Sequence, residues 1–436
     1  MSDHSMSHVA VLGAFGKMGS GISLIVLAAM AEQELSLTGK LGNYRLHLVD
    51  ANESIYAEVL IKIRKHLRDH AEKNIQNIRT SFSTRKDLVE NQEIIEEFIN
   101  GAVACIRVTT DCATIKKCNI VFEAASENID LKVKLFTIIK SNCEMVPVFL
   151  TNTSSIPIAE LASKTGLTGQ IIGYHFYNPP QKQKLVELVI PENTNQTAIS
   201  IAEQITKSLR KTTVPSSDVA GFIGNGHFMR EILQADKMVG GDFAKIPELD
   251  SITRDLLVRP MGIFQLMDYV GLDVCQAILK VMSQYLKIDL SSSLINQYML
   301  AGIKGGQNPD GSQKNGFFQY EKHKIAGYYS LSSKSYLPIP TFDSKKLAME
   351  IYAEYSPWKE INLQSLDIKN AYFTSYFKAL FHSKDVKAQM ACKYLLASRK
   401  IAEELVKDKV AAKIDDVNKV LMLGFQHAYG PGNQYY

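Results

Sequence analysis

Short apolar runs alternate with longer amphipathic stretches along the first half of the chain. The apolar runs predict buried strands at His8–Leu12, Arg45–Val49, Asn119–Glu123, Val148–Thr151, Ile171–Phe176 and Leu185–Ile190. Runs of this length without regular polar positions are typical of strands that are covered on both faces. Because helical stretches separate them, the pattern predicts an α/β domain over residues 1–213 with a doubly wound, mostly parallel sheet.

The pattern changes after the second strand and again near the middle of the chain. Residues 52–100 are polar, helical in period and free of proline, which predicts an inserted helical hairpin. From about Pro215 the strand signals fade and amphipathic helices dominate. We predict these helices at Phe222–Val239, Ile246–Leu257, Ile263–Leu286 and Ser291–Ile303. Residues 214–330 are therefore predicted to form an all-α helical domain.

The remaining residues, 331–436, are interpreted as a linker followed by a second helical repeat. Residues 321–343 are rich in Lys, Ser and Tyr and contain prolines, which predicts the linker, and residues 344–424 have a helical pattern. The stretch L-D-S-I-T-R-D-L-L at 249–257 returns without a gap as I-D-D-V-N-K-V-L-M at 414–422, each time after a long helix. This predicts a degenerate internal repeat. The alternative is that two amphipathic helices share caps and apolar spacing by chance.

Composition narrows the class of protein. The 436 residues are 46% hydrophobic and 22% charged, which fits a globular protein of two or three domains. A net charge of +4 argues against a nucleic-acid or membrane-surface partner, and the six cysteines form no C-x-x-C pair and are interpreted as reduced thiols. The N-terminus lacks the pattern of a secretory signal, and the apolar helix after Gly21 is expected to be too short for a bilayer. We therefore expect a cytoplasmic protein.

Glycines recur between the first predicted strand and a helix. Gly13, Gly16 and Gly19 permit a tight turn and a close approach of the backbone to a pyrophosphate, and the helix N-terminus offers N–H donors. The spacing differs from the commoner G-x-G-x-x-G, so a merely structural turn stays open as the alternative. In this strand–turn–helix context we predict a Rossmann-like dinucleotide site.

The second predicted strand ends at Asp50. Its carboxylate can accept hydrogen bonds from an adenosine ribose and would repel a 2′-phosphate. Ala51 and Asn52 follow rather than an arginine, which favours NAD over NADP as the cofactor. The alternative is a surface aspartate that caps the next helix.

A histidine and a glutamate flank the turn N-P-P-Q-K-Q-K. If the strands on either side are antiparallel neighbours about a turn centred near Gln181, His175 and Glu187 face each other. A carboxylate beside an imidazole fixes its tautomer and stabilises the imidazolium, which makes a base for an alcohol proton. Such a pair is also often structural.

Polar side chains follow the fourth predicted strand. The hydroxyls of the segment Thr151-Asn152-Thr153-Ser154-Ser155 can bond a substrate oxygen or a carboxamide, or can simply cap the next helix. Asn225, in G-F-I-G-N, can polarise a carbonyl or can be an ordinary polar helix residue.

Several segments together resemble the L-3-hydroxyacyl-CoA dehydrogenase family. They are V-F-E-A-A-S-E-N-I-D-L-K, T-N-T-S-S, H-F-Y-N-P, K-L-V-E-L-V, D-V-A-G-F-I-G-N and R-P-M-G-I-F-Q-L-M-D-Y-V-G-L-D, and the resemblance runs in order over residues 8–320. It implies an NAD domain and a helical domain that closes the substrate cleft.

The resemblance implies roles for individual residues. It assigns the catalytic base to His175, its partner to Glu187 and substrate contacts to Ser154 and Asn225, with Asn178 in both substrate and cofactor binding. Together with the glycines and Asp50, the predicted cofactor contacts are Gly13, Phe15, Gly16, Lys17, Met18, Gly19, Asp50, Glu127, Lys132, Asn152, Ser154 and Asn178.

The implied reaction is the NAD-dependent oxidation of an L-3-hydroxyacyl-CoA thioester to 3-ketoacyl-CoA, as in fatty-acid β-oxidation or 3-hydroxybutyryl-CoA metabolism. Ser154, Asn225 and His175 would position the 3-oxygen, and His175 would take its proton. Glu187 would offset the charge that develops on the imidazole. The protein supplies positioning and electrostatics.

A basic helix in the insertion is a candidate contact for coenzyme A. At helical spacing Lys62, Lys65, His66, Asp69 and Lys73 share one face. This face is either solvated or binds phosphate groups, and the resemblance implies a coenzyme A contact at Lys73. His66 and His70 have the spacing of helical metal ligands, but no further ligand cluster supports a metal site, so we expect none.

The chain departs from the family's pattern in three places. The glycine loop carries one extra residue around Phe15-Gly16-Lys17, and a family lysine has no clear counterpart in S-Q-K-N-G-F-F. The second helical copy reads V-K-A-Q-M-A where the first has the G-F-I-G-N asparagine. We therefore expect this copy to be non-catalytic and to pack against the first. That predicts a monomer with an internal pseudo-dimer, or a homodimer.

Two other functions compete with this interpretation. One is a non-catalytic relative that binds NAD and coenzyme A. The other is a Rossmann reductase with a different small substrate, because G-A-F-G-K-M-G also resembles reductase loops. If the dehydrogenase interpretation holds, a hydratase or thiolase of the same pathway is the implied partner.

Overall fold

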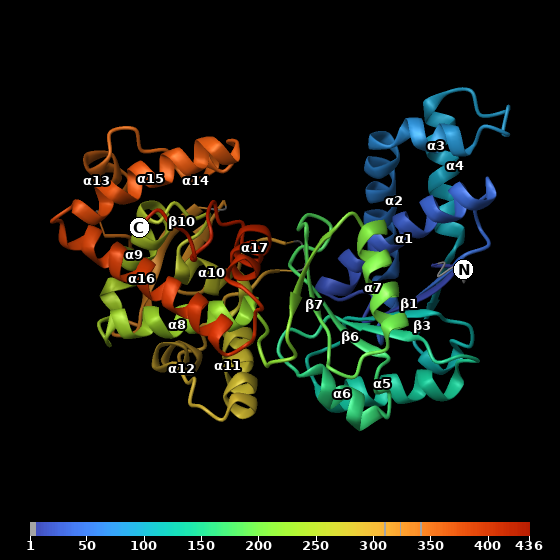
Figure 1. Cartoon of the computed structure of the whole chain (residues 1–436), viewed down its shortest axis with the longest axis horizontal. Coiled ribbons are helices and arrows are strands. Elements are labelled where there is room, and N and C mark those ends of the chain that lie inside the picture. Colours follow the sequence, from blue (N-terminus) through green and yellow to red (C-terminus); the bar gives the residue numbers. More distant parts are fainter. Residues whose placement is uncertain (1–5, 309–310, 323, 341) are drawn as a thin grey trace. The chain divides into compact units, whose positions relative to one another are not determined.

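The computed structural model describes residues 6–308, 311–322, 324–340 and 342–436. The chain forms two compact units, Met1–Asp218 and Val219–Tyr436 (Figure 1). The boundary predicted at residue 213 falls inside the last strand of the first unit, so that unit extends to Asp218.

The first unit is built on one sheet with the strand order β3-β2-β1-β4-β5-β6-β7-β8. The strands are β1 (His8–Leu12), β2 (Arg45–Val49), β3 (Ile106–Thr109), β4 (Ile120–Glu123), β5 (Val148–Thr151), β6 (Ile171–Phe176), β7 (Leu185–Val189) and β8 (Thr212–Ser216). Neighbours are parallel except β6 and β7, which are antiparallel. The predicted doubly wound, mostly parallel sheet is therefore confirmed.

The six predicted strands are present with ends within one residue of the prediction, but two strands were missed. The missed strands, β3 and β8, lie at the two edges of the sheet and are only partly buried. An edge strand needs no continuous apolar run, because one side of it faces solvent. The sequences I-R-V-T and T-T-V-P-S therefore lack the signal that marked the central strands.

Helices cover both faces of this sheet. They are α1 (Lys17–Thr38), α2 (Tyr56–Lys73), α3 (Ile75–Ser81), α4 (Asn91–Ala104), α5 (Ile129–Asn142), α6 (Ile158–Thr165) and α7 (Gln196–Ser208). In Figure 1, α5 and α6 lie on one side of the strands and α1 and α7 on the other. The predicted helical insertion is present as α2, α3 and α4, which form the crossover from β2 to the missed strand β3.

Helix α1 is longer than the sequence suggested. It has 22 residues and is long and apolar enough to cross a bilayer, so the expectation that it is too short was wrong. Most of its residues are instead buried in the core of the first unit, which accounts for their apolar character. A buried core helix of a folded domain passes the same length and hydropathy test as a membrane span.

The second unit is mostly helical. Its helices are α8 (Gly224–Val239), α9 (Ile246–Ser251), the π-helix η4 (Ile252–Leu256), α10 (Ile263–Val270), α11 (Leu272–Leu286), α12 (Ser293–Leu300), α13 (Ser344–Ile351), α14 (Trp358–Ile361), α15 (Leu366–His382), α16 (Val386–Lys407) and α17 (Ile414–Gly424). The helix predicted over 263–286 is broken at Gly271, which has a φ of 108° that other residues rarely adopt.

The prediction of a linker at 321–343 was wrong, and the domain is not all-α. A three-stranded antiparallel sheet forms there from β9 (Phe318–Glu321), β10 (Lys324–Ser330) and β11 (Ser335–Pro338). Its tyrosines pack on the core of the second unit, and the hydroxyl of Tyr298 on α12 donates to the carbonyl of Tyr329. The polar residues that indicated a linker are on the exposed side of a thin sheet.

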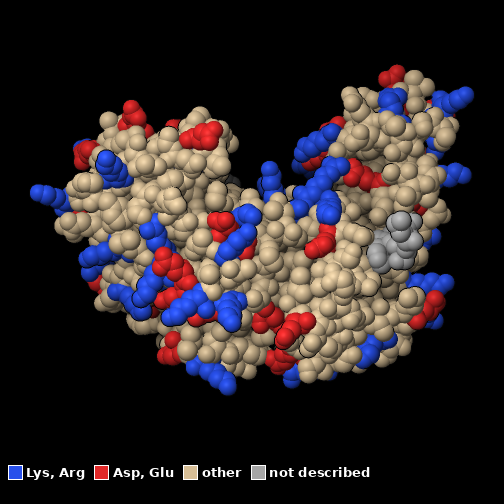
Figure 2. All heavy atoms as spheres, in the orientation of Figure 1, with Lys and Arg blue, Asp and Glu red and all other residues tan. Residues whose placement is uncertain are grey.

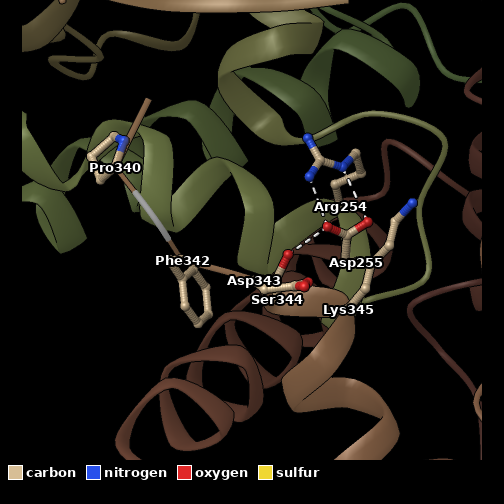
Figure 3. A pocket seen from close by; sticks show the side chains of 7 residues that line it. All are labelled: Arg254, Asp255, Pro340, Phe342, Asp343, Ser344 and Lys345. Atoms are coloured by element: carbon tan, nitrogen blue, oxygen red, sulfur yellow. Dashed lines mark hydrogen bonds and ion pairs between the residues drawn. The ribbon is translucent and has the colours of Figure 1, made fainter. Parts of the chain in front are cut away.

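A polar network joins the start of α13 to η4 (Figure 3). The carboxylate of Asp255 accepts two hydrogen bonds from the guanidinium of Arg254, at 3.1 and 2.7 Å, and one from the hydroxyl of Ser344 at the start of α13. These charged groups line a pocket with Pro340, Phe342 and Lys345. Because they satisfy one another, we interpret the network as structural.

The two predicted helical domains, 214–330 and 331–436, share one core in a single unit. Helix α16 packs along α8, and Tyr376 and Tyr429 donate hydrogen bonds of 2.8 Å to the carbonyls of Leu256 and Leu257. A Cβ at Gly226 of α8 would lie 3.1 Å from a methyl of Leu405 on α16, so glycine permits the close approach. The second block therefore packs against the first, as the sequence predicted.

Candidate active site

The predicted site residues of the first unit lie where strands end. Gly13 follows β1, Asp50 follows β2, Glu127 follows β4, Ser154 follows β5 and His175 lies near the end of β6. These five strands are parallel, so their carboxyl ends meet at one edge of the sheet. Ligands of doubly wound sheets bind at this edge.

The glycine turn fits a dinucleotide because two of its glycines leave no room for a side chain. Gly13 has a φ of 71°, and a Cβ on it would lie 2.6 Å from the carbonyl oxygen of Ala124. A Cβ on Gly19 would lie 1.9 Å from the carbonyl oxygen of Gly13. Gly16 is the N-cap residue of α1 and has no side chain to cap the helix, and a Cβ there would touch nothing closer than 3.4 Å. The tight turn and the uncapped helix end suit the pyrophosphate of NAD.

Substituting Gly19 by alanine should open this turn. We expect the free energy of unfolding to fall by about 1–3 kcal/mol, because the new methyl overlaps a backbone oxygen, and NAD binding to weaken at least tenfold. Gly16→Ala is the matched control, since its methyl has room, so it should leave the unfolding free energy within about 1 kcal/mol. Urea unfolding and titration with NAD measure the two effects. A Gly19→Ala protein as stable as wild type would contradict the turn geometry.

Asp50 holds the turn from the neighbouring strand. Its carboxylate accepts hydrogen bonds from the backbone N–H of Phe15 at 2.9 Å and of Asn52 at 3.1 Å. The next short helix is capped by Asn52, whose side chain accepts from Ser54, so Asp50 is not its cap. A ribose contact at Asp50 stays a prediction.

The other turn residues differ in what they can offer a cofactor. The ring of Phe15 is buried and packs against Tyr56, with ring centroids 6.0 Å apart, so only its backbone borders the turn. Met18 is half-buried against the core, and Lys17 is the exposed first residue of α1. Their cofactor contacts stay predictions.

His175 and Glu187 face each other across the antiparallel pair β6 and β7, as their spacing predicted. Nδ1 of His175 lies 3.2 Å from Oε2 of Glu187, and Glu187 is fully buried. The hydroxyl of Tyr177 donates to the same carboxylate oxygen at 2.8 Å. Burial and the charge of Glu187 raise the pKa of Tyr177 well above 10, so its hydroxyl keeps its proton. The carboxylate thus orients an imidazole that can act as a base.

Glu127 organises the hydroxyl segment after β5. One of its carboxylate oxygens accepts from the hydroxyls of Thr153 (2.6 Å) and Ser155 (3.1 Å) and from the backbone N–H of Ser154 (3.0 Å). Burial alone would raise the pKa of Glu127, but Lys132 and these hydrogen bonds outweigh it and lower the pKa. Glu127 therefore stays ionised and fixes the backbone at Ser154.

Lys132 is only 1% exposed, and its ammonium lies 2.7 Å from Glu123 and 3.4 Å from Glu127. Burial would lower the pKa of Lys132, but the two carboxylates raise it. The predicted cofactor contacts of Glu127 and Lys132 stay predictions. Glu123, at the end of β4, also accepts from the hydroxyl of Thr151.

Two asparagines occupy the same edge. The side chain of Asn152 accepts from the backbone N–H of Phe176 at 2.8 Å, which ties the segment after β5 to β6. The carbonyl of Asn178, in the turn after β6, accepts from the side chain of Gln183 at 3.4 Å. Their cofactor and substrate contacts stay predictions.

Lys73 and Asn225 are carried by two other helices, α2 and α8. Lys73 is the exposed last residue of α2. Figure 2 shows Lys and Arg side chains in the region of this helix on the first unit. Asn225 lies in the first turn of α8, in the second unit. The contacts of both with substrate stay predictions.

His70 on α2 has an acidic protein partner. Nε2 of His70 lies 2.9 Å from Glu32, and burial beside His70 lowers the pKa of His66 to about 4. Among the described residues no group of His, Cys, Asp and Glu could hold a metal ion.

Two further residues, Glu123 and Tyr177, belong to the cluster and were not predicted from the sequence. Tyr177 follows His175 by two positions, and residues two apart on an extended strand point to the same face. That spacing is a signal from which it could have been found. Glu123 ends a predicted strand, but only the fold shows that Lys132 reaches it.

Comparisons with known proteins agree with this geometry. Residues 8–219 match the family model of the 3-hydroxyacyl-CoA dehydrogenase NAD binding domain, and residues 221–315 match the C-terminal domain of that family. The chain is 30% identical over 275 residues to the mitochondrial hydroxyacyl-coenzyme A dehydrogenase of Mus musculus, covering 63% of this chain and 79% of the relative. It is 33% identical over 211 residues to a probable 3-hydroxybutyryl-CoA dehydrogenase of Deinococcus radiodurans, covering 48% and 76%.

Solved structures extend the likeness. The structure of (S)-3-hydroxybutyryl-CoA dehydrogenase from Ralstonia eutropha has a TM-score of 0.56 at 25% identity and covers 69% of this chain and 96% of that chain. A 3-hydroxybutyryl-CoA dehydrogenase from Escherichia coli has a TM-score of 0.62 at 19% identity and covers 98% and 90%. The second of these shows that the fold, including the second helical block, is shared.

Proposed function

This chain belongs to the 3-hydroxyacyl-CoA dehydrogenase family, and from that membership we propose that it catalyses the NAD-dependent oxidation of an L-3-hydroxyacyl-CoA to the 3-ketoacyl-CoA. The observation that carries the proposal is the buried pair His175 and Glu187, 3.2 Å apart at the sheet edge that also holds the glycine turn. A relative that only bound its ligands would not need an imidazole held by a buried carboxylate.

His175 acts as the base in this proposal. Its Nδ1 faces Glu187, so Nε2 is the ring nitrogen that takes the proton of the 3-hydroxyl group. Glu187 stabilises the imidazolium that results, and its burial strengthens this interaction because little water screens it. Ser154, with its backbone fixed by Glu127, and Asn225 would position the 3-oxygen.

Two features of the first unit fit NAD: the glycine turn and Asp50. Gly13, Gly16 and Gly19 would hold the pyrophosphate, and Asp50 the adenosine ribose. When bound there, NAD would supply the acceptor for the hydride from C3. The negative charge of Asp50 at the end of β2 favours NAD over NADP, because it would repel a 2′-phosphate.

The acyl-CoA substrate follows from the family, and we propose that its phosphates bind the basic side chains of α2, including Lys73.

We further propose that the second helical block packs on the first in the way that a second subunit would, so that the chain is a monomer with an internal pseudo-dimer. Its packing along α8 supports this. A hydratase or thiolase that acts on the same thioesters is the proposed partner.

The relatives include mitochondrial enzymes. For this chain we propose a cytoplasmic location.

The absorbance of NADH tests the proposal on the wild-type protein. We expect NADH to be consumed with acetoacetyl-CoA and formed with L-3-hydroxybutyryl-CoA, and NADPH to be used at least tenfold less efficiently. Rates on longer 3-ketoacyl thioesters would define the chain length. NAD binding without turnover on any thioester would favour the non-catalytic relative, and turnover of a free keto acid alone would favour a different reductase.

A further inference from the structure

Glu187 serves two hydrogen-bond donors with one oxygen. Its Oε2 lies 3.2 Å from Nδ1 of His175 and accepts from the hydroxyl of Tyr177 at 2.8 Å. All three residues are at most 8% exposed. The proposed mechanism uses the imidazole and the carboxylate but leaves the tyrosine without a role.

The fold explains why the three groups meet. The antiparallel register of β6 and β7 sets residue 187 opposite residue 175. Tyr177 follows His175 by two positions, directly after the end of β6, and its ring lies beside the imidazole, with the two ring centroids 4.8 Å apart. The shorter of the two contacts belongs to the tyrosine.

Resting on the proposed dehydrogenase function, we propose that Tyr177 is a positioning residue that shares Glu187 with His175 and thereby keeps the base unprotonated at lower pH. The argument compares the two protonation states of the imidazole. When His175 is neutral, the ion pair is absent, and the hydroxyl of Tyr177 stabilises the charge of Glu187 strongly. When His175 is protonated, the ion pair already offsets that charge, and the tyrosine adds less. The hydroxyl therefore stabilises the state that can accept the substrate proton.

Tyr177 is a donor throughout the working range, because burial and the charge of Glu187 keep its hydroxyl protonated. The titratable groups on neighbouring segments have partners elsewhere. Tyr174 on β6 bonds to Thr206, Lys211 before β8 donates to the carbonyls of Pro180 and Gln183, and Asp218 after β8 accepts from the first turn of α6. Val214 on β8, opposite Glu187, is apolar.

The test is the pH profile of kcat/KM for oxidation of L-3-hydroxybutyryl-CoA. Tyr177→Phe keeps the ring and removes the donor, so the acid limb should move upward by about 0.5–1 unit, which corresponds to about 0.7–1.4 kcal/mol. The plateau at high pH and the KM for NAD should change less than about threefold. Tyr174→Phe is the matched control: it also removes a buried, bonded hydroxyl from β6, 2.7 Å from Thr206, and should not move the limb.

A second comparison isolates the path through the carboxylate. In the Glu187→Gln background, Tyr177→Phe should cause no further shift, because the charge that the hydroxyl stabilises is gone. An unmoved limb, an equal shift in Tyr174→Phe, or a shift that persists in the Glu187→Gln background would each overturn the inference.

An NMR titration separates this inference from the proposed function. The imidazole signal of His175, identified by its loss in His175→Gln, should titrate at higher pH in Tyr177→Phe than in wild type, whether or not the protein turns over. Absence of wild-type turnover would contradict the proposed function, and an unchanged titration midpoint would contradict the role of Tyr177.

Discussion

Replacing His175 by glutamine should reduce kcat by about 10²–10⁴-fold, the contribution expected of a general base. Glutamine is similar in length and can still donate a hydrogen bond to Glu187, so the strands should keep their register. Its amide cannot accept the substrate proton. The glycine turn lies at a different strand end and is unaffected, so the dissociation constant for NAD should change by less than about threefold. Steady-state rates with acetoacetyl-CoA and a titration with NAD measure the two quantities.

A control histidine makes this result specific. His47 on β2 pairs with Ala10 and Arg107 in the same sheet and has no predicted role, so His47→Gln should retain activity. Unchanged activity in His175→Gln would refute the assigned base. Loss of both activity and NAD binding would indicate a folding defect instead, which thermal unfolding would reveal.

Removing the carboxylate of Glu231 should destabilise the second unit by about 3–5 kcal/mol, because it leaves a buried charge without its partner. Glu231 on α8 accepts hydrogen bonds from both terminal nitrogens of Arg259, at 3.0 and 2.9 Å. The two side chains are only 4% and 6% exposed. The guanidinium also lies 5.4 Å from the ring centroid of Tyr394 on α16, so the pair holds the two helical blocks together.

The pair also gives stability a pH dependence. Burial would raise the pKa of Glu231, but Arg259 outweighs it and lowers the pKa to about 2. A carboxyl with a lowered pKa contributes stability above its unfolded value, and that contribution is lost as the pH falls toward 2. Wild type should therefore lose stability in acid more steeply than Glu231→Ala does.

Thermal and urea unfolding measure this prediction. For a unit of this size, about 2–4 °C is expected per kcal/mol, so Glu231→Ala should lower the melting temperature of the second unit by about 6–20 °C. Glu248→Ala is the control, because its pair with Lys387 is about 31% exposed and should contribute less than about 1 kcal/mol. An apolar double variant, Glu231→Leu with Arg259→Met, should recover most of the loss. Equal effects of Glu231→Ala and Glu248→Ala would contradict the prediction.

Only part of the candidate site could be predicted from the sequence. The pairing of His175 with Glu187 followed from their spacing about one turn, because strand register is local there. The glycine turn could be predicted for the same reason, because its residues are close together along the chain. The sharing of Glu187 by Tyr177 and the contact of Lys132 with Glu123 were not found, since they depend on side-chain directions and on how α5 packs.

By itself, the sequence determined the buried strands, the helical insertion, the glycine turn and the facing pair. Each of these features follows from the spacing of apolar residues or from residues that are close together along the chain. The tertiary structure alone decided the edge strands β3 and β8, the small sheet at 318–338 and the joint core of the two helical blocks. Edge strands and thin sheets carry mixed polar patterns, and their stability comes from neighbours that are distant in the sequence, such as α12 beneath β10.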